Sequence, residues 1–245
     1  MTSNSTDFIT SYSPTIMLDS NKNYEAALIS LDTYHSFPNI VSDDNDPKTI
    51  ENNIFKYSND DGKTWKTITL DTGSYELSAI NSEIQRQMIE NGDFDVENNS
   101  FYINITTNIS TLKSVIEITN DNYKVYFGVE SSIGPVLGFG PTILSSGYNI
   151  SPNIVDIMKV NSILVNIDII EGSYVNGSNS PTIYSFYPNV APGYKIIERP
   201  TTIIYYPVSN YNIRTMRVWL TDQDGNSVDL RGEMLAVRVA LREVK

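Results

Sequence analysis

The one histidine of the chain, His35, is the first residue to consider for acid–base chemistry, because histidine titrates near neutral pH. It lies in the segment Thr33–Asn39, and the sequence contains no Gly-x-Ser-x-Gly nucleophile elbow to pair with it. The chain has no cysteine, which excludes disulfides, thiolate metal sites and cysteine nucleophiles. We therefore interpret His35 as a surface or loop-packing residue, and we expect no catalytic residue and no enzyme activity.

Two acidic loops bring together the oxygen atoms that a calcium ion prefers. In Asp222–Asn226, however, Gly225 comes too early for an EF-hand, and no glutamate closes the loop. The Asp-Gly pair is explained fully by a tight turn. Asp43–Asp46 precedes Pro47 and is typical of a solvated loop. We expect neither a metal ion nor a cofactor, although a hydrolase built on two carboxylates stays an alternative, since their spacing is spatial.

The charge balance limits the partners of the chain. With 17 Lys and Arg against 29 Asp and Glu, the 245 residues carry a formal charge of -12, which disfavours nucleic-acid binding. Residues 1–150 hold 8 basic and 20 acidic residues, whereas residues 151–245 hold 9 of each. This asymmetry indicates either an acidic face or acidic loops that maintain solubility. The N-terminal residues lack a signal-peptide pattern, and no apolar run is long enough for a membrane span.

Alternation of apolar and polar residues with a period of two dominates the sequence and predicts antiparallel strands. In the clearest example, Leu235, Val237 and Val239 share one face, while Arg238 and Arg242 share the other. Tight hairpin turns are predicted at Ser58–Gly62 and Asp222–Gly225. The predicted strands cover residues 24–31, 54–57, 64–70, 101–107, 114–119, 123–127, 163–170, 182–186, 194–197, 203–206, 216–220, 228–230 and 235–241.

One segment has helical spacing instead. Ile80, Ile84 and Met88 predict an inserted α-helix over about residues 78–91, with Ser78 as its N-cap and Gly92 after its end. Together with the strands, this pattern predicts an all-β fold, an antiparallel β-sandwich with one inserted helix.

We expect residues 1–20 to form a flexible N-terminal arm and residues 21–245 to form a single domain. Glycines and prolines near residues 140–152 mark an internal seam, which is either a domain boundary or a long loop. The number of strands favours one domain.

Aromatic residues crowd the C-terminal part of the chain. They predict a protein interface, in which tyrosine is enriched, or alternatively a carbohydrate site. The candidate interface residues are Tyr184, Phe186, Tyr187, Tyr205, Tyr206 and Tyr211.

Several short stretches, in this order, resemble jelly-roll capsid proteins of Polinton/Maverick-type elements and adintoviruses, most of all the penton-type (minor capsid) protein. The resemblance spans most of residues 16–242 and rests on patterns of strands and turns. The stretches that carry it are Ile16–Leu18 with Tyr24–Leu28, Gly73–Glu76, Val136–Phe139, Val218–Gly225 and Val228–Glu233.

The resemblance implies a single jelly roll that forms homopentamers at the vertices of an icosahedral virion and packs against a separate major capsid protein. The helix and the strands beyond eight depart from a minimal jelly roll. No catalytic residue is carried over from the family. A small trimeric major capsid subunit and a carbohydrate-binding or adhesin β-sandwich remain alternatives.

Overall fold

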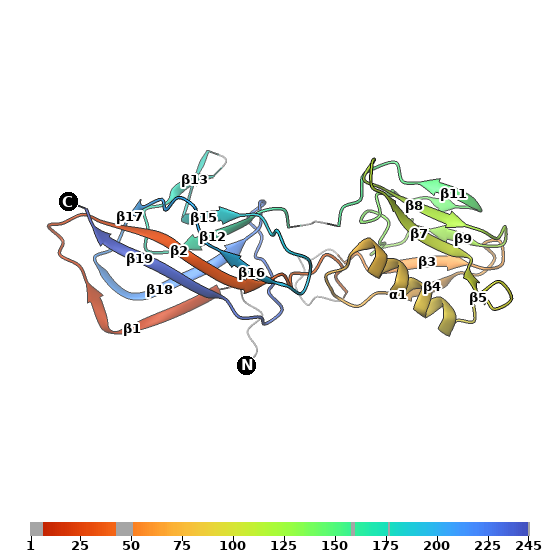
Figure 1. Cartoon of the computed structure of the whole chain (residues 1–245), viewed down its shortest axis with the longest axis horizontal. Helices are drawn as coiled ribbons and strands as arrows, with labels where there is room; N and C mark the ends of the chain where they lie inside the picture. The colour runs from red at the N-terminus through yellow and green to blue at the C-terminus, as the bar shows by residue number, and fades with distance from the viewer. Residues whose placement is uncertain (1–6, 43–50, 158–159, 176, 245) are drawn as a thin grey trace. The chain divides into compact units, whose positions relative to one another are not determined.

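The computed structural model describes residues 7–42, 51–157, 160–175 and 177–244 (Figure 1). The chain is divided into two compact units. Unit 1 consists of Met1–Phe37 and Val160–Lys245, and unit 2 consists of Pro38–Lys159. The named strands of both units pair in antiparallel ladders, and α1 is the one α-helix of the described residues. The predicted all-β sandwich with one inserted helix is therefore confirmed.

Two sheets form unit 1. The strand order in the first is β1-β18-β12-β15; in the second, β2 pairs with β16 and β17 and also with β19. β13 and β14 form a separate hairpin. The bounds are β1 Asp7–Met17, β2 Tyr24–Tyr34, β12 Ile163–Ile167, β13 Ser173–Val175, β14 Ser178–Ser180, β15 Thr182–Phe186, β16 Lys195–Glu198, β17 Tyr206–Pro207, β18 Asn212–Thr221 and β19 Ala236–Glu243.

The core of unit 1 follows the predicted alternation. Leu31 of β2, Val165 of β12 and Leu220 of β18 are completely buried in one hydrophobic cluster. Val237 and Val239 of β19 pack against the same cluster, while Arg238 between them is exposed. The side chains of β19 therefore lie on the faces that its sequence predicts.

Strand β1 corrects the expectation of a flexible arm over residues 1–20. Asp7–Met17 pairs with β18 in an antiparallel ladder, whose register shifts between Ser11 and Ile16. The shift interrupts the period of two, so the sequence does not read as a regular strand. Tyr12 and Ile16 nevertheless pack against the core of unit 1. Residues 1–6 of the predicted arm lie outside the described residues.

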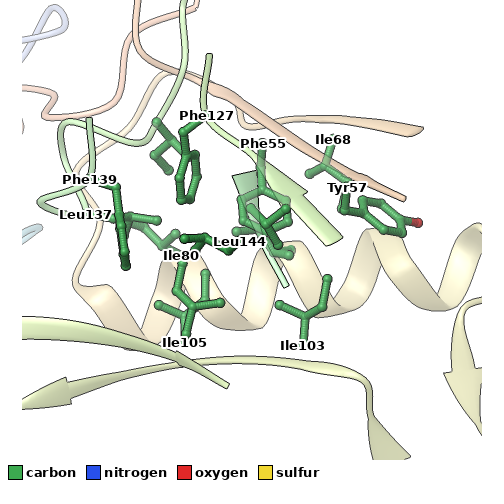
Figure 2. Packing of buried hydrophobic residues seen from close by; sticks show 14 of the residues in the cluster. Phe55, Tyr57, Ile68, Ile80, Ile103, Ile105, Phe127, Leu137, Phe139 and Leu144 are labelled. Atoms are coloured by element: carbon green, nitrogen blue, oxygen red, sulfur yellow. The ribbon is translucent and has the colours of Figure 1, made fainter. Parts of the chain in front are cut away.

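Unit 2 also contains two main sheets, with strand orders β10-β9-β3-β4 and β11-β8-β7, and β5 pairs with β6. The bounds are β3 Ile54–Ser58, β4 Lys66–Thr69, α1 Leu77–Glu90, β5 Phe94–Asp95, β6 Ser100–Phe101, β7 Ile103–Asn108, β8 Lys113–Ile118, β9 Lys124–Tyr126, β10 Ile143–Leu144 and β11 Gly147–Ile150. Figure 2 shows Phe55 of β3, Ile80 of α1 and Ile105 of β7 in the core of this unit.

Helix α1 lies within one residue of its predicted bounds. Ile80, Ile84 and Met88 are buried, as their spacing predicts. The helix begins at Leu77, so Glu76 occupies the N-cap position instead of the expected Ser78. Gly92 follows the helix with a φ of 75°, a left-handed conformation that glycine adopts without strain.

The helix also covers one edge of a sheet. The backbone N–H of Ile105 donates to the side-chain oxygen of Asn81 at 2.8 Å, and the Gln85 amide donates to Asn104 at 2.8 Å. These bonds satisfy polar groups at the edge of β7 and leave β11 as the other outer strand of that sheet.

The division into two units differs from the single domain expected over residues 21–245. The expected seam near residues 140–152 lies inside unit 2, where Ile143 pairs with Tyr126 and Ile150 pairs with Val115. The units meet in sequence at residues 37–38 and 159–160. Each unit buries a hydrophobic cluster of its own, and this is the physical basis of the division.

Candidate functional site

His35 packs a loop against the end of a strand. Its Nδ1 lies 2.7 Å from the carbonyl oxygen of Val190, and its ring stacks on Phe37 with centroids 4.3 Å apart. Its backbone N–H donates to the carbonyl of Tyr194 at 2.9 Å. These contacts hold the loop before β16 against the end of β2, and they agree with the loop-packing interpretation.

The acidic turn at Asp222–Asn226 uses its oxygen atoms internally. Asp222 Oδ1 accepts the backbone N–H groups of Asp224 and Asn226 at 2.9 and 2.8 Å, and its Oδ2 accepts the Asn226 amide at 3.0 Å. Within the described residues, no group of three or more His, Cys, Asp or Glu could hold a metal ion. The predicted acidic loop Asp43–Asp46 lies outside those residues.

Asp93 is the centre of a polar cluster in unit 2. Its carboxylate accepts hydrogen bonds from Tyr57 at 2.5 Å, from Asn59 at 2.7 Å and from Tyr123 at 3.3 Å, and Lys66 forms an ion pair with it at 2.6 Å. The donors come from β3, from the turn after it, from β4 and from the segment before β9. Only 4% of the Asp93 residue surface is exposed.

The ionisation of the Asp93 cluster follows from these contacts. Burial acts to raise the pKa of Asp93, but the hydrogen bonds from Lys66, Tyr57 and Asn59 outweigh it and lower that pKa. Burial and the neighbouring carboxylate raise the pKa of both Tyr57 and Tyr123. The cluster is thus a carboxylate held between neutral phenols and an ammonium group, with both oxygens occupied. Such an arrangement stabilises structure and leaves no oxygen for a substrate.

Sequence reasoning did not find the Asp93 cluster. Its members come from separate parts of unit 2, and no local motif relates them. Asp60 and Asp61 of the turn and Glu90 of α1 are also acidic, so residue type alone does not single out Asp93. Only the contact between Tyr57 of β3 and Asp93, after the end of α1, identifies Asp93 as the centre of the cluster.

The six candidate interface residues do not form one exposed surface. Phe186 is buried in the core of unit 1, and Tyr184 stacks beside it with ring centroids 6.3 Å apart. Tyr206 is half-buried against the same core, and Tyr211 packs edge-on against Tyr24.

The remaining two candidates are more accessible. Tyr187, directly after the outer strand β15, is 73% exposed. Tyr205 is half-buried, and the guanidinium carbon of Arg242 lies over its ring, 3.3 Å from the ring centroid. Arg242 also forms an ion pair with Glu25 at 2.8 Å. Tyr187 is therefore the one member of the six with most of its surface free to contact another molecule.

The strands at the margins of unit 1 are the second feature that bears on assembly. Within the described residues, β1 pairs only with β18, β15 only with β12, and both β16 and β19 only with β2. Strands with one unpaired edge offer backbone donors and acceptors to another chain. The unit therefore combines a buried core with several strands, these four among them, that pair along one edge only within the described residues.

The described residues include no helix that is long and apolar enough to cross a membrane. No protein-family model matches the chain, and no curated protein matches it. Among solved structures, the chain is similar to the penton protein of mavirus, with 11% sequence identity and a TM-score of 0.48. The similarity covers 97% of this chain and 91% of the mavirus protein.

Proposed function

We propose that this chain is a structural protein of a viral or virus-like capsid that acts by self-assembly, as a penton-type minor capsid subunit in the virion. The unpaired outer strands of unit 1 carry the proposal, because assembly covers strand edges that would otherwise face solvent. The sequence resemblance over residues 16–242 supports the same role and gives its finer form, a homopentamer that contacts a major capsid protein.

The contacts of Asp93 and His35 support a structural role in a second way. The buried Asp93 has both carboxylate oxygens occupied, and His35 is held by a backbone carbonyl. Each of these groups stabilises a local packing arrangement. The function of the chain then lies in the surfaces that it buries against neighbours, without a cofactor or catalysis.

The mass of the assembled protein tests the proposal. In size-exclusion chromatography with light scattering, we expect a species of five times the 27.5 kDa monomer, which associates with a co-expressed major capsid protein. Three times the monomer mass would support the trimeric major capsid alternative instead. A strictly monomeric chain that binds no major capsid protein would contradict the capsid role. If that monomer binds glycans on an array, the carbohydrate-binding alternative is supported instead.

A pair of tyrosine variants tests where the subunits meet. Tyr187→Ser removes an exposed ring at the end of the outer strand β15, and we expect it to weaken assembly. Tyr174→Ser is the matched control, because Tyr174 is 79% exposed but lies in the β13–β14 hairpin. Equal effects of the two substitutions would show that Tyr187 is not part of the interface.

A further inference from the structure

Strand β11, at the edge of the sheet β11-β8-β7 in unit 2, exposes its apolar residues, whereas β7 and β8 bury their isoleucines. In β11, Tyr148 and Ile150 are 75% and 60% exposed. Ser151, directly after β11, and Ser114 of β8 are almost completely buried. A strand at the surface normally buries its apolar residues and exposes its polar ones. The reversal therefore marks a surface that is suited to contact with an apolar partner.

Hydrogen bonds hold this reversed register in place. The Ser114 hydroxyl donates to the carbonyl of Leu137 at 2.5 Å, and the Ser151 hydroxyl accepts the backbone N–H of Ser114 at 3.1 Å. The Asn149 amide donates to three carbonyls, those of Ser145, Gly147 and Ile116. A slip by one residue would bury Tyr148 and Ile150 but would break these bonds. The exposed apolar residues are thus a fixed property of the unit.

The exposed residues form a shallow groove without a charged lining residue. Ile109 stands at one end of the groove, in the turn between β7 and β8, and is 83% exposed. The lining residues are Thr107, Asn108, Ile109, Val115, Tyr148 and Ile150.

The charges at the two ends of this face are opposite. Lys113, Val115 and Glu117 alternate along β8 with buried residues, so the three side chains share the outer face. The Lys113 ammonium donates to the carbonyl of Pro152 at 2.8 Å, beyond the end of β11. Glu117 lies at the other end, where its carboxylate next to the Tyr148 hydroxyl raises the pKa of that tyrosine. The face therefore runs from positive through apolar to negative.

We propose that this face binds the same face of a second copy of the chain about a two-fold axis. With the axis across the strands at Val115, the strands of the two copies run in opposite directions. Lys113 of each copy then lies opposite the acidic end of the other, where Glu117 is placed. A two-fold interface requires such self-complementarity, because the same patch serves both copies.

Packing of the two sheet faces adds apolar contacts to the match between Lys113 and Glu117. Ile150 lies beside Val115 in the antiparallel register, so the two residues form the row that the axis follows. Each Ile150 and Val115 then meets its own counterpart, as in two sheets that pack face to face. Lys113 keeps its bond to Pro152, since an ammonium group has further N–H donors for the glutamate.

The net charge of unit 2 selects the salt conditions for the contact. Residues 38–159 contain 17 Asp and Glu against 8 Lys and Arg, a formal charge of -9, so two units repel at long range. At about 0.15 M salt, charges more than about 8 Å apart are largely screened, so the long-range repulsion is weakened. The two charges of an ion pair lie closer together than this distance, so their attraction is screened less. Association is therefore expected to be stronger at 0.15 M salt than at 0.01 M salt.

Sedimentation of the full chain over a range of concentrations tests the proposal. Ile150→Asp and Lys113→Glu should each weaken the two-fold association by about 10-fold or more, since each places an unpaired charge in the contact. The double variant Lys113→Glu with Glu117→Lys should restore it to within about 3-fold, because the exchange preserves self-complementarity. Ile89→Asp, on the exposed side of α1, is the matched control and should leave the association unchanged.

Two results would overturn the proposal. One is a wild-type chain whose sedimenting species never reaches twice the mass that it has at low concentration. The other is a double variant that associates no better than Lys113→Glu. In a Trp219→Phe background, fluorescence of Trp65, the one tryptophan of unit 2, shows whether unit 2 of each variant is folded. Tyr187→Ser changes unit 1, whereas the two-fold contact lies in unit 2. A Tyr187→Ser chain that loses the larger assembly but still forms the two-fold dimer would therefore show that the two contacts are separate.

Discussion

The hydroxyl of Tyr57 donates a hydrogen bond to the carboxylate of Asp93 at 2.5 Å, and both residues are buried. Tyr57 lies in β3 and Asp93 follows the end of α1, so the bond joins a sheet to a helix of unit 2. Lys66 of β4 binds the same carboxylate at 2.6 Å. One acidic side chain thus fixes three separate elements, and its removal should affect all of them.

Replacement of the buried Asp93 by alanine should lower the free energy of unfolding of unit 2 by about 3 kcal/mol, because Lys66 loses its counter-charge and two tyrosine hydroxyls lose their acceptor. A larger loss is not expected, since the Lys66 side chain is 33% exposed and partly solvated. Trp65 fluorescence during urea denaturation, in a Trp219→Phe background, reports on unit 2 alone.

Glu90→Ala is the control for the Asp93 substitution. It also removes a carboxylate from an ion pair, here with Arg86, but Glu90 is largely exposed and should matter little. Equal losses of stability in the two variants would show that the buried cluster has no special role.

The pH dependence of unit 2 should follow the lowered pKa of Asp93. A carboxyl whose pKa is lower in the folded than in the unfolded state stabilises the fold above the unfolded value, about 3.9. That contribution is lost as the pH falls through the folded value. The difference in unfolding free energy between the wild type and Asp93→Asn should therefore be constant from about pH 6 to 8 and narrow below about pH 4. A difference that stays constant at low pH would contradict the assignment.

Core substitutions should separate the two units. Ile84→Ala opens the core of unit 2 and Leu220→Ala opens that of unit 1, and each should cost about 2–5 kcal/mol. In a Trp219→Phe background Trp65 should report only the first change, and in a Trp65→Phe background Trp219 should report only the second, since each unit contains one tryptophan. Coupled transitions, in which either substitution shifts both signals equally, would show that the units unfold as one.

Periodicity predicted the elements that have one regular face. Ile80, Ile84 and Met88 repeat at helical spacing and are all buried, and the alternating strand β19 packs as predicted. Shorter or irregular pairing was not predicted. Residues 203–206 contribute only Tyr206 to a strand, and residues 228–230 form no strand.

The division into units and the accessible tyrosines depend on contacts between distant residues. Phe186 and Tyr187 are neighbours of similar type, yet one is in the core and the other is exposed. Burial of Phe186 is determined by the packing of β15 against the rest of unit 1, which local composition does not encode. The glycines near residues 140–152 indicated a seam, but strand pairing makes that segment part of unit 2.

Asn39 shows what defines the start of unit 2 and gives the last prediction. Its amide donates to the carbonyls of Tyr75 and Ile157 at 2.7 and 3.0 Å, and its oxygen accepts the Tyr75 N–H at 2.8 Å. One buried side chain thus ties the first residues of the unit to its last ones.

Asn39→Asp tests this arrangement, because it replaces the donating amide with a carboxylate oxygen that faces two carbonyls. At neutral pH we expect unit 2 to lose about 2–4 kcal/mol of unfolding free energy, from repulsion and from lost hydrogen bonds. The folded state would raise the pKa of the new carboxyl, so the loss should shrink as the pH falls and the carboxyl becomes a donor. Asn39→Ala, which cannot titrate, should show a loss that does not change with pH. An aspartate variant that is as stable as the wild type at pH 7 would show that these bonds do not hold the two ends of the unit together.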